Sequence, residues 1–111
     1  MSVMKPLAIM SVCLCVAAVP WALAGAANGD AAKGKTVFAA CAVCHNADST
    51  ETKMGPGLKG LFKRDKLKSG KKVTEATVRA RIDEGGGGMP GYEDMLTDGE
   101  KDDLIAYLKT L

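Results

Sequence analysis

The sequence predicts a small all-α domain of three to four helices, and three observations lead to that prediction. No stretch alternates apolar and polar residues with a period of two for long enough to indicate a sheet. Residues that commonly precede helices stand before apolar residues at helical spacing in three places, at Asp30, Thr74 and Thr97. The 111-residue chain also contains no internal repeat and no low-complexity tract, so a single domain is expected.

Residues 1–24 are predicted to lie outside this domain, as an export signal. Lys5 is followed by an apolar run, Leu7 to Val19, and then by Ala22-Leu23-Ala24, which resembles a cleavage site. The run has about 13 residues, too few to span a bilayer, so no stable membrane insertion is expected. Cleavage after Ala24, with Ala26 as the alternative, leaves residues 25–111 as the mature domain, which is expected in the periplasm as a monomer.

The charges of the mature domain are balanced overall but segregated along the chain. It has 14 basic and 13 acidic side chains, a balance that gives nucleic-acid binding no support. Residues 59–72 contain seven basic residues and one acid, whereas residues 93–103 contain six acids and one lysine. Two interpretations remain open, namely two solvated faces or a dipole that orients a partner with an acidic surface.

The first predicted helix begins after Asp30, a good N-cap residue, and extends from Ala31 to about Cys44. Four of its residues recur at spacings of four, three and four, which places them on one stripe of the helix. They are Gly34, Phe38, Cys41 and His45. This stripe is expected to meet something large and apolar.

The second helix is predicted to begin after Thr74 and to stop at Gly85, with Val73 and Val78 as a hydrophobic staple. A long connection, residues 46–72, precedes it. Gly55-Pro56-Gly57 breaks the backbone of that connection, and a short helical turn is expected near Leu61. Connections of this length commonly surround a functional site.

The last helix is predicted to begin at Thr97, which forms a capping box with Glu100. Its apolar face recurs at helical spacing up to the end of the chain. The residues of that face are Leu104, Ile105, Leu108 and Leu111.

Cys41-Ala42-Val43-Cys44-His45 is the C-x-x-C-H sequence to which a c-type haem is attached. Cysteines three residues apart in a helical turn share one face, so both can reach one edge of a porphyrin while the adjacent histidine binds the iron. A thioredoxin-like redox pair would require a βαβ pattern, which is absent. A closed zinc site would require four ligands, and the mature domain has only two cysteines and one histidine.

Because His45 is the only histidine, a second histidine ligand is excluded, and a methionine is expected on the other side of the iron. Met89 is the preferred candidate, since it lies between four glycines that allow a close backbone approach and Pro90, which stiffens the loop. Met54 lies beside the Gly-Pro-Gly break, which is assigned to the histidine side, and Met95 is expected to be buried near the last helix. An open sixth position remains the other alternative.

At these residues the chain resembles the class I monohaem cytochromes c of bacteria, over nearly all of the mature segment. The matching residues are Gly34, Phe38, Cys41 to His45, Gly55 to Leu58, Gly88 to Pro90 and Tyr107. The resemblance implies a cytochrome c fold wrapped around one covalently bound haem c, in which the first and last helices cross, with Gly34 at the close approach and Phe38 packed near Tyr107. It also implies that the Pro56 carbonyl accepts the Nδ1 proton of His45.

The function expected from these features is that of a single-electron carrier, cycling Fe(III) and Fe(II) outside the cytoplasmic membrane between redox protein partners. No catalytic residues are expected, because both axial positions of the iron would be filled. Two alternatives remain. The chain is a haem subunit of a larger oxidoreductase, or, if the glycine-rich loop lets Met89 leave, it binds a small gas or peroxide.

Overall fold

The computed structural model describes residues 29–111, and it confirms the predicted all-α class. The elements, in chain order, are α1 (Ala31–Phe38), the 3₁₀-helix η1 (Leu61–Lys63), α2 (Glu75–Glu84) and α3 (Asp98–Leu108). Within residues 29–111 the β-type pairings are two isolated bridges, Lys66 with Lys72 and Gly86 with Met89. No helix in this part of the chain is long and apolar enough to cross a membrane. The expected export signal, residues 1–24, lies outside the described residues.

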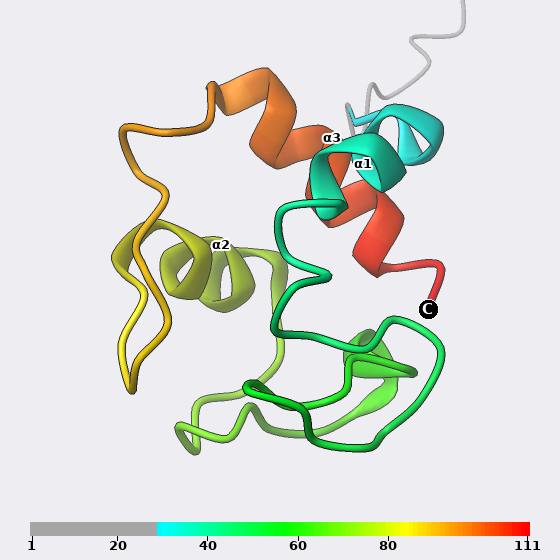
Figure 1. Ribbon diagram of the computed structural model, residues 1–111, viewed down its shortest axis with the longest axis vertical. Helices are drawn as coiled ribbons and strands as arrows, with labels where there is room; N and C mark the ends of the chain where they lie inside the picture. Colours follow the sequence, from blue (N-terminus) through cyan, green and yellow to red (C-terminus); the bar gives the residue numbers. More distant parts are fainter. Residues whose placement is uncertain (1–28) are drawn as a thin grey trace, which may run out of the picture.

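The first and last helices pack directly against each other, as predicted (Figure 1). Gly34 makes the close approach possible, because a Cβ atom there would lie 1.9 Å from the carbonyl oxygen of Asp103 in α3. One turn later the rings of Phe38 and Tyr107 meet with centroids 5.3 Å apart and planes tilted by 54°. The carboxylate of Asp103 also accepts a hydrogen bond from the backbone N–H of Asp30, at 2.7 Å.

Replacing Gly34 with alanine is expected to destabilise the fold by about 1–3 kcal/mol, the usual cost of overpacking a close contact. The methyl group would meet backbone atoms of α3, which cannot rotate away. Denaturant-induced unfolding of the haem-loaded protein measures the change. Gly99→Ala is the matched control, since its Cβ would meet only Thr97 Oγ1 at 3.9 Å and the backbone is helical. Equal unfolding midpoints for the two variants would contradict the close-approach role of Gly34.

Three local capping signals place the starts of the helices. The Asp30 carboxylate accepts hydrogen bonds from the backbone N–H groups of Ala32 and Lys33. Thr97 accepts only the bond from the N–H of Glu100, at 3.1 Å. The reciprocal capping box that was expected at Thr97 is found instead at the start of α2, between Thr74 and Thr77.

The first helix is shorter than predicted, since α1 ends at Phe38 and not near Cys44. Beyond Phe38 the chain continues as a series of tighter turns, in which the N–H of Ala40 bonds to the carbonyl of Val37 and the N–H of Cys41 to that of Phe38. These are bonds to the third preceding residue, whereas an α-helix uses the fourth. The N–H groups of Ala42 and His45 still bond to the fourth preceding residue, so part of the helical spacing persists and periodicity alone predicts a longer helix.

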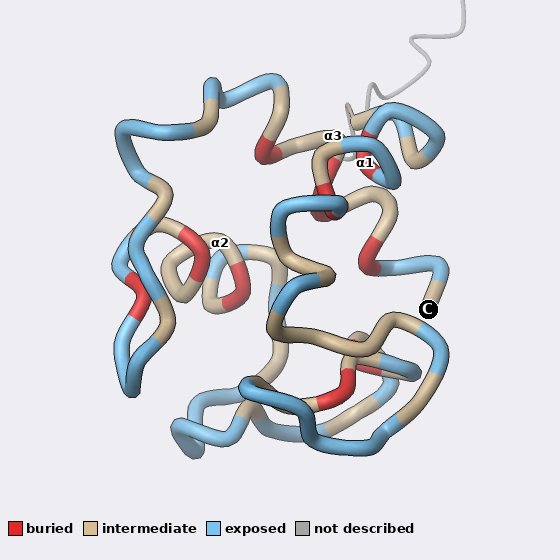
Figure 2. The backbone as a smooth tube through the Cα atoms, viewed as in Figure 1, coloured by how far each residue is buried: buried red, intermediate tan, exposed pale blue. Residues whose placement is uncertain are grey.

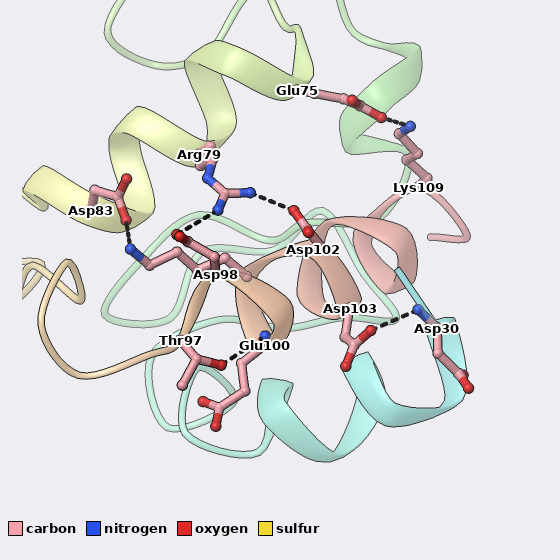
Figure 3. A network of polar contacts seen from close by, with 11 residues as sticks. Asp30, Glu75, Arg79, Asp83, Thr97, Asp98, Glu100, Asp102, Asp103 and Lys109 are labelled. Carbon is pink, nitrogen blue, oxygen red and sulfur yellow. Dashed lines mark hydrogen bonds and ion pairs between the residues drawn. The ribbon is translucent and has the colours of Figure 1, made fainter. Parts of the chain in front are cut away.

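Ion pairs tie α2 to α3 (Figure 3). The Arg79 guanidinium lies 2.9 Å from the Asp98 carboxylate and 2.5 Å from that of Asp102. Lys101 is buried, and its Nζ lies 2.7 Å from Asp83 Oδ1. Ion pairs therefore hold the second helix against the third, in addition to the apolar side chains that both helices contribute to the core.

The apolar core of the described residues is thin. Its buried members lie in the three α-helices and η1 (Figure 2). The buried residues are Phe38, Leu61, Val78, Ile82, Leu104, Ile105 and Leu108. Twelve further apolar side chains pack against this cluster but remain partly exposed, among them Leu58, Leu67 and Tyr92. More apolar side chains are thus partly exposed to solvent than fully buried.

Candidate functional site

Cys41, Cys44 and His45 lie together on the turn that follows α1. The N–H groups of both Cys44 and His45 donate to the carbonyl of Cys41, at 3.1 and 2.9 Å. This turn keeps the two thiols and the imidazole close to one another, and all three residues are half-buried. Both cysteines are free thiols, so the pair is available for covalent attachment of a ligand.

The imidazole of His45 is fixed by the loop that carries Pro56. His45 Nδ1 lies 2.8 Å from the carbonyl oxygen of Pro56. Because a carbonyl oxygen only accepts, Nδ1 carries the proton and Nε2 keeps its lone pair for a metal. Gly55 packs flat against the ring, since a Cβ there would lie 2.5 Å from His45 Cε1. The Pro56 contact that the resemblance implies is therefore present.

Basic side chains hold this loop in place, and the sequence does not indicate that they do so. The Arg64 guanidinium donates to the carbonyl oxygens of Gly57 and Lys59, at 2.8 and 2.7 Å. Lys53 Nζ donates to the carbonyl of Ala42, inside the C-x-x-C turn, at 3.0 Å. From the sequence alone, Lys53 and Arg64 look like ordinary surface cations. Their partners are backbone carbonyls, and no pattern of side chains in the sequence marks such a contact.

The Cys41 thiol lies in a partly apolar environment. Burial, and to a smaller extent the neighbouring Cys44, raise the pKa of the Cys41 thiol. Cys41 is therefore protonated at neutral pH and behaves as an apolar side chain within the partly covered cluster, of which it is a member.

Two of the three candidate methionines lie at the surface. Met54 is 81% exposed, and its Sδ lies 3.9 Å from Cys44 Sγ, beside the glycine that packs on His45. Met54 therefore lies next to the Cys41–His45 turn. Met95 is 68% exposed, so the expectation that it is buried near the last helix was wrong. The segment before α3 turns its side chain outward, although its neighbour Leu96 packs against the core.

Met89 is half-buried and follows a hydrogen-bonded turn of four glycines. The N–H of Gly86 donates to the carbonyl of Met89 at 2.9 Å, and the N–H of Met89 donates back to the carbonyl of Gly86 at 3.1 Å. Between them, Gly87 and Gly88 have φ values of 61° and 92°, which only glycine adopts without strain. The glycine run is therefore one defined hairpin turn. In Figure 1 it lies on the α2 side of the molecule, apart from the Cys41–His45 turn.

The described residues fit a covalently bound haem. Two free thiols and an imidazole with a free Nε2 share one turn, as such attachment requires. Twelve half-covered apolar side chains surround a core of seven, and a large apolar group would complete their burial. The structure brings Cys41, Cys44, His45 and Pro56 together, whereas Met89 comes from a separate segment that no hydrogen bond of its side chain joins to them within residues 29–111.

Comparison with known proteins gives a consistent result. The family model described as Cytochrome c matches residues 31–111. Cytochrome c2 of Blastochloris viridis is 37% identical over an alignment of 105 residues, and the match covers 78% of this chain and 82% of that protein. Cytochrome c6 of Synechocystis sp. is 34% identical over 80 residues, and the match spans 71% of this chain and 63% of the length of that protein.

Solved structures resemble the fold at a similar level. Cytochrome c6 from the diatom Phaeodactylum tricornutum has a TM-score of 0.59 and 27% identity, covering 74% of this chain and 93% of that one. Cytochrome cH from Methylobacterium extorquens has a TM-score of 0.56 and 31% identity, covering 75% of this chain and all of the other.

Proposed function

The chain belongs to the cytochrome c family, and from that membership we propose that it carries single electrons on one haem c held by Cys41, Cys44, His45 and Met89. Members of this family are electron carriers with a covalently bound haem, and they are not enzymes. The haem supplies the redox chemistry, as its iron takes up and releases one electron. The residues of the chain bind the haem, orient the iron ligands and limit the access of water.

The observation that carries the proposal is the arrangement of the Cys41–His45 turn against Pro56. The two cysteines would form thioether bonds to the haem, and His45 Nε2 would bind its iron. The hydrogen bond from Nδ1 to the Pro56 carbonyl fixes the ring and increases the basicity of Nε2. Gly55, against the flat side of the ring, prevents the imidazole from tilting towards the loop.

We assign the second axial position to Met89, and the placement of Met54 supports this assignment. An iron ligand opposite His45 has to come from the other side of the haem. Met54 lies beside Cys44 and is joined to the loop that binds His45, so it would be poorly placed to bind opposite His45. Met89 comes from a separate segment, and its turn is held by two backbone hydrogen bonds. This ordered turn does not favour the alternative of a labile methionine and a gas-binding site.

Replacing Met89 with alanine is expected to leave the iron of the purified holoprotein without its sulfur ligand. Visible spectra should then show a high-spin or water-bound iron, the reduced form should bind carbon monoxide readily, and the reduction potential should fall, since thioether ligation raises it. Met54→Ala and Met95→Ala are the controls, because both side chains are exposed. A wild-type spectrum in Met89→Ala would show that another group is the ligand.

We also propose that the lysines of residues 59–72 guide a partner with an acidic surface. Lys66, Lys68, Lys71 and Lys72 are exposed on a small hairpin, closed by the bridge between Lys66 and Lys72. Oxidation of the reduced protein by ferricyanide, a small anion, should slow as ionic strength rises, because salt screens the attraction. Lys68→Gln/Lys71→Gln should weaken that salt dependence more than Lys33→Gln/Lys35→Gln on α1. Equal slopes would contradict the proposal.

The location of the protein outside the cytoplasmic membrane is likewise a proposal. It is supported by the sequence of residues 1–24, in which a basic residue, an apolar run and small residues follow one another as in an export signal. The intact mass of the protein purified from the periplasm tests it, since cleavage after Ala24 or Ala26 gives two distinguishable masses. The mass of the uncleaved chain would contradict it.

A further inference from the structure

Arg81 lies in the last turn of α2, and its guanidinium reaches the glycine turn that leads to Met89. Its Nη1 donates a hydrogen bond to the carbonyl oxygen of Gly85, at 2.9 Å. A Cβ atom on Gly86 would lie 2.8 Å from the same Nη1, so the guanidinium also packs directly on Gly86. One side chain therefore contacts both residues at the base of the turn.

Gly85 and Gly86, at the base of the turn, also contact the backbone of Met89. A Cβ atom on Gly85 would lie only 2.4 Å from the carbonyl oxygen of Met89, so these two backbone segments are in direct contact. Gly86 exchanges both hydrogen bonds of the bridge with Met89. Any movement of Gly85 and Gly86 is therefore transmitted to the backbone that carries the Met89 side chain.

The guanidinium has no competing role in an ion pair. The four ion pairs among residues 29–111 involve Arg79, Lys101 and Lys109 as cations, and Arg81 takes part in none of them. Its hydrogen bond goes to a backbone carbonyl, and a charged donor makes such a bond stronger than a neutral one. The half-buried position protects that bond from water.

We propose that Arg81 is the positioning residue for Met89, and that it controls whether a small ligand can reach the iron opposite His45. This inference rests on the proposed function, in which Met89 Sδ fills that position. The hydrogen bond to Gly85 and the contact with Gly86 hold the turn closed. If they were lost, the turn would open more often, Met89 Sδ would hold the position opposite His45 for less of the time, and that position would become accessible to an external ligand.

The test compares two arginines of the same helix in the purified holoprotein. Arg81→Gln is expected to increase the affinity of the reduced form for carbon monoxide about tenfold, because the apparent affinity follows the fraction of molecules with an open position. Arg79→Gln removes an arginine that pairs with Asp98 and Asp102 and does not contact the turn, so carbon monoxide binding should stay at the wild-type level. Loss of structural stability alone would affect Arg79→Gln at least as strongly.

A second pair of variants tests the same idea if Arg81→Gln does not fold. Gly86→Ala places a methyl group against Nη1 and displaces the guanidinium, whereas the Cβ of Gly87→Ala meets no atom within 4 Å. Both positions have positive φ, at 121° and 61°, so both variants carry backbone strain. Gly86→Ala should bind carbon monoxide more tightly than Gly87→Ala.

Met89→Ala separates the two possible failures. If carbon monoxide binding and the spectrum stay unchanged in Met89→Ala, the assignment of Met89 is wrong, and with it the proposed ligand set. If Met89→Ala opens the site but Arg81→Gln binds carbon monoxide no better than Arg79→Gln, or Gly86→Ala no better than Gly87→Ala, the role of Arg81 is overturned.

Discussion

Replacing both Cys41 and Cys44 with serine is expected to yield a protein without covalently bound haem and without a stable fold. Serine cannot form the thioether bonds, so the haem can dissociate. The described residues bury only seven apolar side chains, too few for a domain of this size to be stable by itself. Loss of the bound group should therefore be followed by unfolding.

Three measurements on the purified double variant test this expectation. A haem stain after denaturing electrophoresis should be lost, the intact mass should equal that of the bare polypeptide, and the helical circular dichroism should fall. Val43→Ser is the matched control, because Val43 lies in the same turn, is 67% exposed and forms no bond to the haem. A folded, haem-stained double serine variant would contradict the covalent attachment that the Cys41–His45 turn indicates.

Replacing Lys101 with methionine is expected to destabilise the protein by about 3 kcal/mol, the lower end of the cost of breaking a buried ion pair. Lys101 is 4% exposed, and it is the buried charged residue in the core of residues 29–111. Its Nζ lies 2.7 Å from Asp83 Oδ1, an atom that has no other polar partner in that part of the chain. The same Nζ donates to the carbonyl of Glu93, so a buried carboxylate oxygen and a backbone carbonyl oxygen would both lose this partner.

Denaturant unfolding of the holoprotein measures this loss, and two further variants interpret it. Lys109→Met breaks the ion pair between Lys109 and Glu75, whose side chains are 34% and 39% exposed, respectively. We therefore expect the free energy of unfolding to fall by about 1 kcal/mol or less. The double variant Lys101→Met/Asp83→Leu should recover most of the stability, because an apolar pair can replace a buried ion pair. If Lys101→Met and Lys109→Met cost the same, the buried pair does not anchor α2 to α3.

Local signals in the sequence were sufficient to predict the starts of the helices and the attachment turn. Asp30, Thr74 and Thr97 cap helices because their side chains bind N–H groups two or three residues ahead, and such short-range contacts are visible in the sequence. The C-x-x-C-H spacing is local in the same sense.

Features that depend on distant contacts were not predictable. The ion pair between Asp83 and Lys101 joins two helices, and nothing in either segment indicates the other. The exposure of Met95 depends on how its segment crosses the surface, and an apolar side chain by itself suggested burial. The early end of α1 at Phe38 reflects backbone hydrogen bonds to the third preceding residue that interrupt those to the fourth, a change that residue spacing does not reveal. The bracing of the Met89 turn by Arg81 is likewise a contact to a backbone carbonyl, which no residue pattern reveals.

The packing of α1 against α3 also determines the order in which the molecule can mature. During synthesis α1 emerges first, and the surface that it covers, around Asp103 and Tyr107, emerges last. Until then α1 has no partner, and a helix of eight residues is not stable alone. The cysteine pair that follows α1 is therefore expected to stay accessible until α3 has been made, and the packing of α1 against α3 then fixes the segment that leads into the Cys41–His45 turn.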